Sequence, residues 1–150
     1  MISLDTLSYK YVLKSDKSSV FKVLVDEQLQ YFQKNDPKII SLEEGTSVQC
    51  NLTTKLQSLP VSSVMEITKL KAEETLQTKT SYSSGMILQM YEFKKDKKGK
   101  DILIYSEKNT FSETRNQYGF MLIGFFYKLF YNRGIAKRMR YIDNLSMHVS

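Results

Sequence analysis

The stretch SVQCNLTTKL, residues 47–56, alternates apolar and polar side chains with a period of two. Val48, Cys50 and Leu52 fall on one side of an extended chain, and the intervening polar residues fall on the other. Successive side chains of a strand point to opposite faces, so this alternation predicts a β-strand that buries one face and exposes the other.

The same period continues along the chain as far as Phe111. Four more strands are expected in series, over residues 61–71, 74–82, 86–93 and 102–111. The connections between them are short, and parallel strands would need long crossovers. The sequence therefore predicts an antiparallel meander.

One strand and one amphipathic helix are expected before the meander. LSYKYVL, residues 7–13, alternates in the manner of a half-buried strand. Apolar residues then recur at helical spacing within residues 15–35. Ser15 or Asp16 is suited to cap the first free amides of this helix. The helix is expected to end before Pro37, because the residue before a proline is disfavoured in the α conformation.

Residues 112–147 show no strand alternation and are expected to form one long helix. A membrane crossing needs about 20 mainly apolar residues. The apolar run Phe120–Tyr131 is shorter than that and contains Lys128, so no transmembrane segment is expected. The second half of the helix has an ordinary apolar face, formed by Ile135, Met139 and Ile142.

The expected order is β-α-β5-α, an α+β fold in which a curved antiparallel sheet of about six strands grips a long C-terminal helix. Through the pieces SSVFKVLVDEQLQ, ILIYSEKNTF and GFFYKLFYNRGIAKRMRYI, the chain resembles the helix-grip, START-like or Bet v 1-like (SRPBCC) superfamily. More narrowly it resembles a small family found chiefly in Firmicutes, domain of unknown function 3284. The chain is expected to be one domain, residues 1–150, and the resemblance covers nearly all of it. It implies a hydrophobic cavity between sheet and helix, but transfers no activity and no site residue.

Net charge, the N-terminal sequence and cysteine content give weaker indications of partner and compartment. The 150 residues carry a formal net charge of +6, which suits an acidic partner without requiring one. The N-terminus MISLDTLSYK lacks the basic and apolar regions of a signal peptide. The single cysteine, Cys50, fits a reducing compartment. A cytoplasmic protein is expected.

Catalytic and metal-binding chemistry is sparse. The only histidine is His148, so a Cys50–His148 dyad would need the C-terminal tail folded back over the sheet. One cysteine and one histidine are too few ligands for a structural zinc site. We expect no cofactor, no metal and no enzymatic activity. Glu107 and Glu92 become site candidates only if they face inward, and exposed positions are the simpler expectation.

A small hydrophobic or lipid-like ligand, held between the sheet and the C-terminal helix, is the leading functional hypothesis. Apolar walls with a few tyrosine hydroxyls would suit such a ligand. The candidate ligand-binding residues are Tyr11, Leu52, Tyr82, Met90, Phe126 and Tyr127.

Two other hypotheses stay open. The aromatic half-helix Phe120–Tyr131 would serve equally well as a homodimer or protein interface. With the adjacent basic residues, it would also suit peripheral contact with a membrane. Nucleic-acid binding is not expected, because the lysine-rich loop KKDKKGKD, residues 94–101, lacks interleaved aromatic residues. The remaining basic residues are expected on a solvated helix face: Arg133, Lys137, Arg138 and Arg140.

Overall fold

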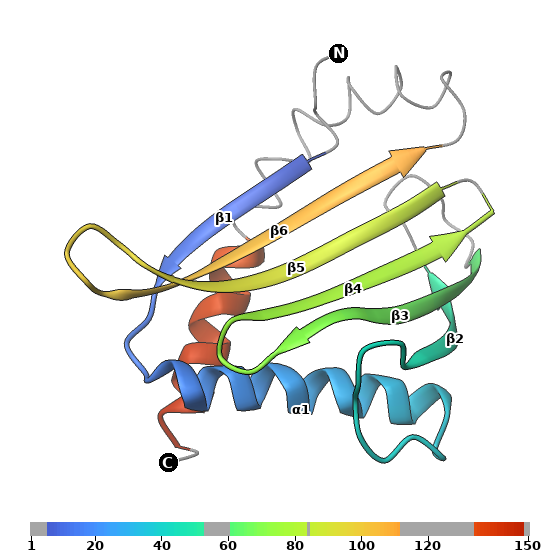
Figure 1. Cartoon of the computed structure of the whole chain (residues 1–150), viewed down its shortest axis with the longest axis horizontal. Coiled ribbons are helices and arrows are strands. Elements are labelled where there is room, and N and C mark those ends of the chain that lie inside the picture. The colour runs from blue at the N-terminus through green and yellow to red at the C-terminus, as the bar shows by residue number, and fades with distance from the viewer. Residues whose placement is uncertain (1–5, 53–60, 84, 112–133, 149–150) are drawn as a thin grey trace.

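A computed structural model describes residues 6–52, 61–83, 85–111 and 134–148 of the chain. Within these residues the chain forms a curved antiparallel sheet and two helices (Figure 1). The bounded elements are β1 (Thr6–Val12), α1 (Lys17–Asn35), β2 (Ser47–Leu52), β3 (Val61–Lys71), β4 (Thr75–Tyr82), β5 (Gly85–Lys95) and β6 (Asp101–Phe111). The C-terminal helix covers residues 134–146.

The strands form one sheet in the order β1-β6-β5-β4-β3-β2. All neighbours pair antiparallel, so the predicted meander from β2 to β6 is confirmed. The first strand of the chain lies beside the last one, with Tyr9 opposite Tyr105. One face of the sheet is buried. On β4, Leu76, Thr78 and Thr80 are buried, as their alternation predicts.

Helix α1 begins and ends close to the predicted positions. The Asp16 carboxylate accepts a hydrogen bond from the Ser19 amide at 3.1 Å, which identifies Asp16 as the N-cap. At the other end, the amide of Asp36 donates to the carbonyl of Phe32 at 2.8 Å. The buried face of the helix consists of Val20, Val23, Leu24 and Phe32.

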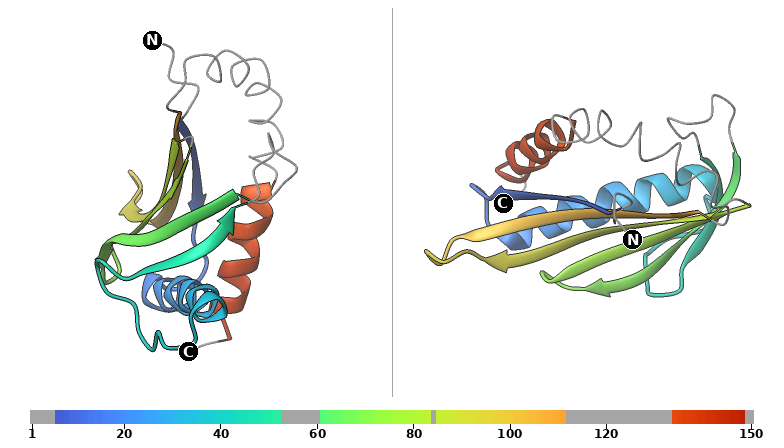
Figure 2. Two further views of the ribbon diagram at one scale, coloured as in Figure 1. Left: turned by 90° about the vertical axis from the view of Figure 1, so that its right-hand side faces the viewer. Right: turned by 90° about the horizontal axis from the view of Figure 1, so that it is seen from above.

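Both helices lie on the same side of the sheet, and α1 runs along its lower edge in the view of Figure 1 (Figures 1 and 2). The core fills the space between the inner sheet face and the two helices. Its most buried members come from every layer: Val20, Phe32, Ile67, Leu76, Leu103, Met139 and Ile142. Burial of apolar surface at about 25 cal/mol per Å² is the main force that holds these layers together.

The described C-terminal helix is short, about 13 residues, where one long helix from residue 112 is predicted. The expected first part, residues 112–133, lies outside the described residues. The predicted apolar face of the second part is confirmed, since Met139 and Ile142 are buried and Ile135 packs against the core. No helix within the described ranges has the length and apolarity that a membrane crossing needs.

Asp143 attaches the C-terminal helix to the junction between β1 and α1. This side chain is fully buried. Its carboxylate accepts hydrogen bonds from the amides of Lys14 and Ser15, both at 2.9 Å, and from the Tyr11 hydroxyl at 3.0 Å. The Ser15 hydroxyl donates to the Asp143 carbonyl at 2.7 Å. Hydrogen bonds to the end of β1 and to the residues just before α1, together with apolar packing, therefore hold the C-terminal helix in place.

Candidate functional site

A pocket of about 300 Å³ opens where α1, the inner sheet face and the C-terminal helix meet. Leu24 and Met65 provide apolar surface, and the other lining residues carry polar groups. The lining residues are Leu24, Glu27, Gln28 and Tyr31 of α1, Met65 of β3, Tyr91 of β5 and Arg138 of the C-terminal helix. The lining therefore combines apolar and polar surface in similar amounts, so it can contact both parts of an amphiphilic molecule.

Arg138 organises the polar wall. Its Nε donates to the Tyr91 hydroxyl at 3.1 Å, and its Nη2 donates to Glu27 Oε2 at 3.2 Å. Burial raises the pKa of Tyr91 and outweighs the opposing effect of Arg138, so the phenol is neutral at physiological pH. Glu27 and Arg138 neutralise one another, because their charges are opposite and in contact. The wall therefore offers hydrogen-bonding groups without a net charge.

Aromatic stacking connects the pocket to the interior of the sheet. The Tyr91 ring lies against the ring of Tyr105 on β6, with centroids 4.8 Å apart. The Tyr105 hydroxyl accepts a hydrogen bond from Gln89 Nε2 at 2.8 Å and donates to Glu107 Oε2 at 3.0 Å. A polar chain from Gln89 through Tyr105 to Glu107 thus lies beside the pocket.

The two glutamates that were site candidates lie on opposite faces. Glu107 pairs with Gln89 and Leu7 and shares their inner face, where it is half-buried. The simpler expectation of an exposed Glu107 is therefore wrong. Glu92 lies on the outer face, 3.9 Å from Lys94. Parity along β6 decides the difference, because buried Leu103 and Tyr105 share the face of Glu107.

Among the described residues, the predicted ligand-binding residues Tyr11 and Met90 lie on opposite faces of the sheet. Tyr11 faces inward but is engaged by Asp143, and burial with this hydrogen bond raises the pKa of Tyr11 to about 12. Tyr82 lies at the end of β4, where burial raises the pKa of its phenol. Leu52 ends β2 opposite Val61. Phe126 and Tyr127 lie outside the described residues.

The prediction that Met90 faces a ligand between the sheet and the helix is wrong, because Met90 lies on the outer face of the sheet. Met90 pairs with Gln77 on β4, on the face opposite buried Leu76 and Thr78, and Gln77 Nε2 lies 3.7 Å from its sulfur. Its neighbour Tyr91 lines the pocket instead. Strand β5 is apolar on both faces near this point, so alternation could not identify the inner one.

Cys50 and His148 occupy different surroundings. Cys50 is buried, and its sulfur lies 3.2 Å from the Ser63 hydroxyl. His148 is exposed at the end of the C-terminal helix. Within the part of the chain that the structure describes, no three His, Cys, Asp or Glu side chains form a group suited to a metal ion.

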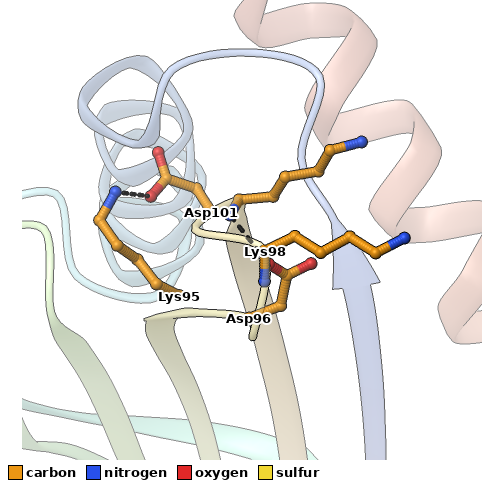
Figure 3. Close-up of polar contacts among 5 residues, drawn as sticks. Lys95, Asp96, Lys98 and Asp101 are labelled. Carbon is orange, nitrogen blue, oxygen red and sulfur yellow. Dashed lines mark hydrogen bonds and ion pairs between the residues drawn. The ribbon is translucent and has the colours of Figure 1, made fainter.

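The lysine-rich loop is a hairpin tip between β5 and β6, as predicted. The Asp96 carboxylate accepts hydrogen bonds from the amides of Lys98 and Lys100 at 2.8 and 2.9 Å. The Lys95 ammonium lies 3.3 Å from Asp101 across the hairpin (Figure 3). Gly99 has a φ of 79°, a conformation that glycine adopts without strain. These hydrogen bonds and this ion pair stabilise the loop as a hairpin turn.

Sequence reasoning missed Tyr91, Glu27 and Arg138. Arg138 was assigned to a solvated basic face, but it contacts Tyr91 and Glu27 across two other elements. A useful signal was present in the sequence, since Arg138 directly precedes the buried Met139 and so lies at the edge of the apolar face. Nothing in the sequence identified its partners, which lie 47 and 111 residues away.

Comparison with known proteins identifies the architecture. No family model matches the chain, and no curated protein matches it either. Solved structures do match: Ara h 8.0201, a Bet v 1-like protein, is 11% identical, with 94% of this chain and 93% of that protein covered and a TM-score of 0.52. The chain has a helix-grip fold.

Two bacterial proteins share this helix-grip fold with slightly higher TM-scores. Ms6760 from Mycobacterium smegmatis is 13% identical and has a TM-score of 0.57. The match covers 100% of this chain and 96% of that protein. A protein from Staphylococcus epidermidis is 10% identical, with 97% and 92% covered and a TM-score of 0.57. Identities this low establish a common fold alone.

Proposed function

We propose that this helix-grip domain is a non-enzymatic binding protein for a small amphiphilic molecule, held in the pocket between α1, the sheet and the C-terminal helix. The observation that carries the proposal is the pocket itself. Its volume of about 300 Å³ is at the lower end of the range for small-molecule sites, so the ligand is compact or enters by one end.

The lining suits a molecule with both apolar and polar parts. Leu24 and Met65 provide apolar contact, and each buried methylene group of a ligand would contribute about 0.8 kcal/mol. Tyr91 and Arg138 provide donors that can orient a polar group at the wall. The likeness to a Bet v 1-like protein and the predicted cavity of the superfamily support the same class of function.

Two narrower assignments belong to the proposal. We propose that the chain belongs to domain of unknown function 3284, a family found chiefly in Firmicutes, because of the sequence resemblance, and that it is cytoplasmic because its single cysteine fits a reducing compartment. The alternative of a homodimer through the aromatic half-helix rests on residues 120–131, which the structure does not describe. The pocket is the feature on which an experiment can act directly.

The proposal is tested first by native mass spectrometry of gently purified protein before and after organic extraction. We expect an additional mass that extraction removes, and rebinding of the neutral fluorophore prodan by the extracted protein. Gln28 lines the pocket from α1, so Gln28→Trp would fill it and should weaken prodan binding at least tenfold. Gln30→Trp, at an exposed position of the same helix, is the matched control and should bind like wild type.

The proposed function fails if wild-type protein carries no extra mass and binds no prodan. It also fails if prodan binds equally to wild type and to both tryptophan variants, because the fluorophore would then occupy another surface.

A further inference from the structure

We propose that the inner sheet face beside the pocket recognises the polar end of the ligand, and that this end is an amine or ammonium group bound by Glu107. The inference rests on the proposed function and specifies its ligand class. A row of polar side chains crosses β6, β5 and β4: Glu107, Gln89 and Thr78.

This polar row lies between the two sheet residues that line the pocket. Gln89 and Thr78 are opposite one another, and Tyr91 lies two residues after Gln89 on the same face. Thr80 lies two residues after Thr78 and pairs with Met65. Side chains in adjacent rows of one face are within reach of each other, so the row adjoins the pocket between Tyr91 and Met65.

Several polar groups on this face are buried without a described partner. Thr78, Thr80 and Asn109 are 4%, 1% and 7% exposed. Within the described residues, none of their side chains makes a hydrogen bond, although buried polar groups usually do. Buried hydroxyl and amide groups of this kind cost stability unless something satisfies them. A bound ligand with a polar end would do so.

Charge determines which polar end fits. Among described residues, Glu107 is the only charged side chain in the three cross-strand rows that contain Tyr91, Gln89 and Met65. Among the described residues only Tyr105 donates to its carboxylate, at Oε2, whereas a carboxylate has about four acceptor sites. A half-buried carboxylate attracts a cation or a strong donor and repels another carboxylate. On the helix side, the charges of Glu27 and Arg138 already compensate each other.

The test compares two probes of equal chain length, decylamine and decan-1-ol, titrated at pH 7 by isothermal calorimetry below the concentrations at which they aggregate. Decylamine is cationic at this pH, because alkylamines have a pKa near that of lysine, about 10.4. We expect wild-type protein to bind decylamine at least tenfold more tightly than decanol.

Glu107→Gln removes the charge and keeps the size of the side chain. We expect it to lower decylamine affinity at least tenfold and to change decanol affinity by a much smaller factor, because a glutamine side chain still offers an acceptor to a hydroxyl group. Glu92→Gln, on the outer face of the neighbouring strand, is the matched control and should leave both affinities unchanged.

Failure of the inference and failure of the proposed function give different results. Equal affinities of wild type for the two probes, or an equal loss of both on Glu107→Gln, would overturn the amine assignment and leave the binding pocket intact. Binding of neither probe, together with no prodan binding, would overturn both. The wild-type comparison tests the proposal even if a Glu107 variant does not fold.

Discussion

The two polar contacts of the C-terminal helix differ in construction. Asp143 is fully buried, and three donors from the β1–α1 junction and β1 converge on its carboxylate. Arg138, more than one turn earlier, has a side chain that is 44% exposed and makes two hydrogen bonds at the edge of the pocket. Asp143 therefore anchors the helix in the interior, whereas Arg138 forms part of the pocket wall at the surface.

This difference separates stability from recognition within one short helix. A buried charge with converging donors contributes strongly to folding, because removal of the charge leaves the donors without a suitable acceptor. An exposed ion pair contributes little, since water competes for both partners. Changes at Asp143 should therefore alter folding, and changes along the pocket should alter binding.

The largest expected effect comes from Asp143→Asn. The new side chain keeps one acceptor oxygen but places an NH2 donor opposite either the Lys14 or the Ser15 amide, and we expect a loss of about 3 kcal/mol in the free energy of unfolding. Urea denaturation followed by circular dichroism measures this loss. Asp26→Asn, at an exposed position on α1, should change stability by less than about 0.5 kcal/mol. Equal stability of the two variants would show that Asp143 is not an anchor.

The same carboxylate predicts a loss of stability in acid. Burial raises the pKa of Asp143, but hydrogen bonds from Lys14, Ser15 and Tyr11 outweigh it and hold the pKa below its ordinary value. The folded protein thus binds this proton less readily than the unfolded chain, whose aspartates titrate near pH 3.9. The resulting stabilisation is fully present above that pH and declines as the pH falls toward the pKa in the folded state.

Thermal unfolding of wild type and Asp143→Asn between pH 7 and pH 3 measures this contribution. The difference in stability between the two proteins should be constant above about pH 5 and shrink as the pH falls further. A difference that stays constant down to pH 3 would contradict the role assigned to the carboxylate.

The smallest effect is expected on the inner sheet face, with the opposite sign. Thr80 is 1% exposed, and its hydroxyl makes no hydrogen bond to another described residue. Thr80→Val should increase the free energy of unfolding of ligand-free protein by about 1 kcal/mol, because it removes a buried hydroxyl that has no partner among the described residues and changes the volume little.

Thr68→Val is the matched control. The Thr68 hydroxyl donates to the Gln77 carbonyl at 3.2 Å, so its loss should destabilise the protein by about 1 kcal/mol. Chemical denaturation of both variants after organic extraction provides the comparison. Destabilisation by Thr80→Val would mean that this hydroxyl supports the fold and is not reserved for a ligand.

The amino-acid sequence determined the strands, the first helix and the order of the meander. Alternation from Val48 onward identified the strands, and short connections required antiparallel neighbours. Helical spacing in the sequence also identified the buried face of the C-terminal helix around Met139 and Ile142. These features follow from local periodicity, because the backbone geometry of a strand or helix fixes which nearby residues share a face.

Tertiary structure alone decided the composition of the site. Met90 and Tyr91 are adjacent in an apolar strand, and only pairing with β4 and β6 shows that Tyr91 faces the pocket. Arg138 reaches Glu27 and Tyr91 only after two helices pack on the same side of the sheet. Glu107 shares a face with Leu103 and Tyr105 by parity along β6, but only the burial of those two residues shows that this face is the inner one. Contacts between distant segments depend on the packing of whole elements, and periodicity along the chain contains no information about which distant residue will be the partner.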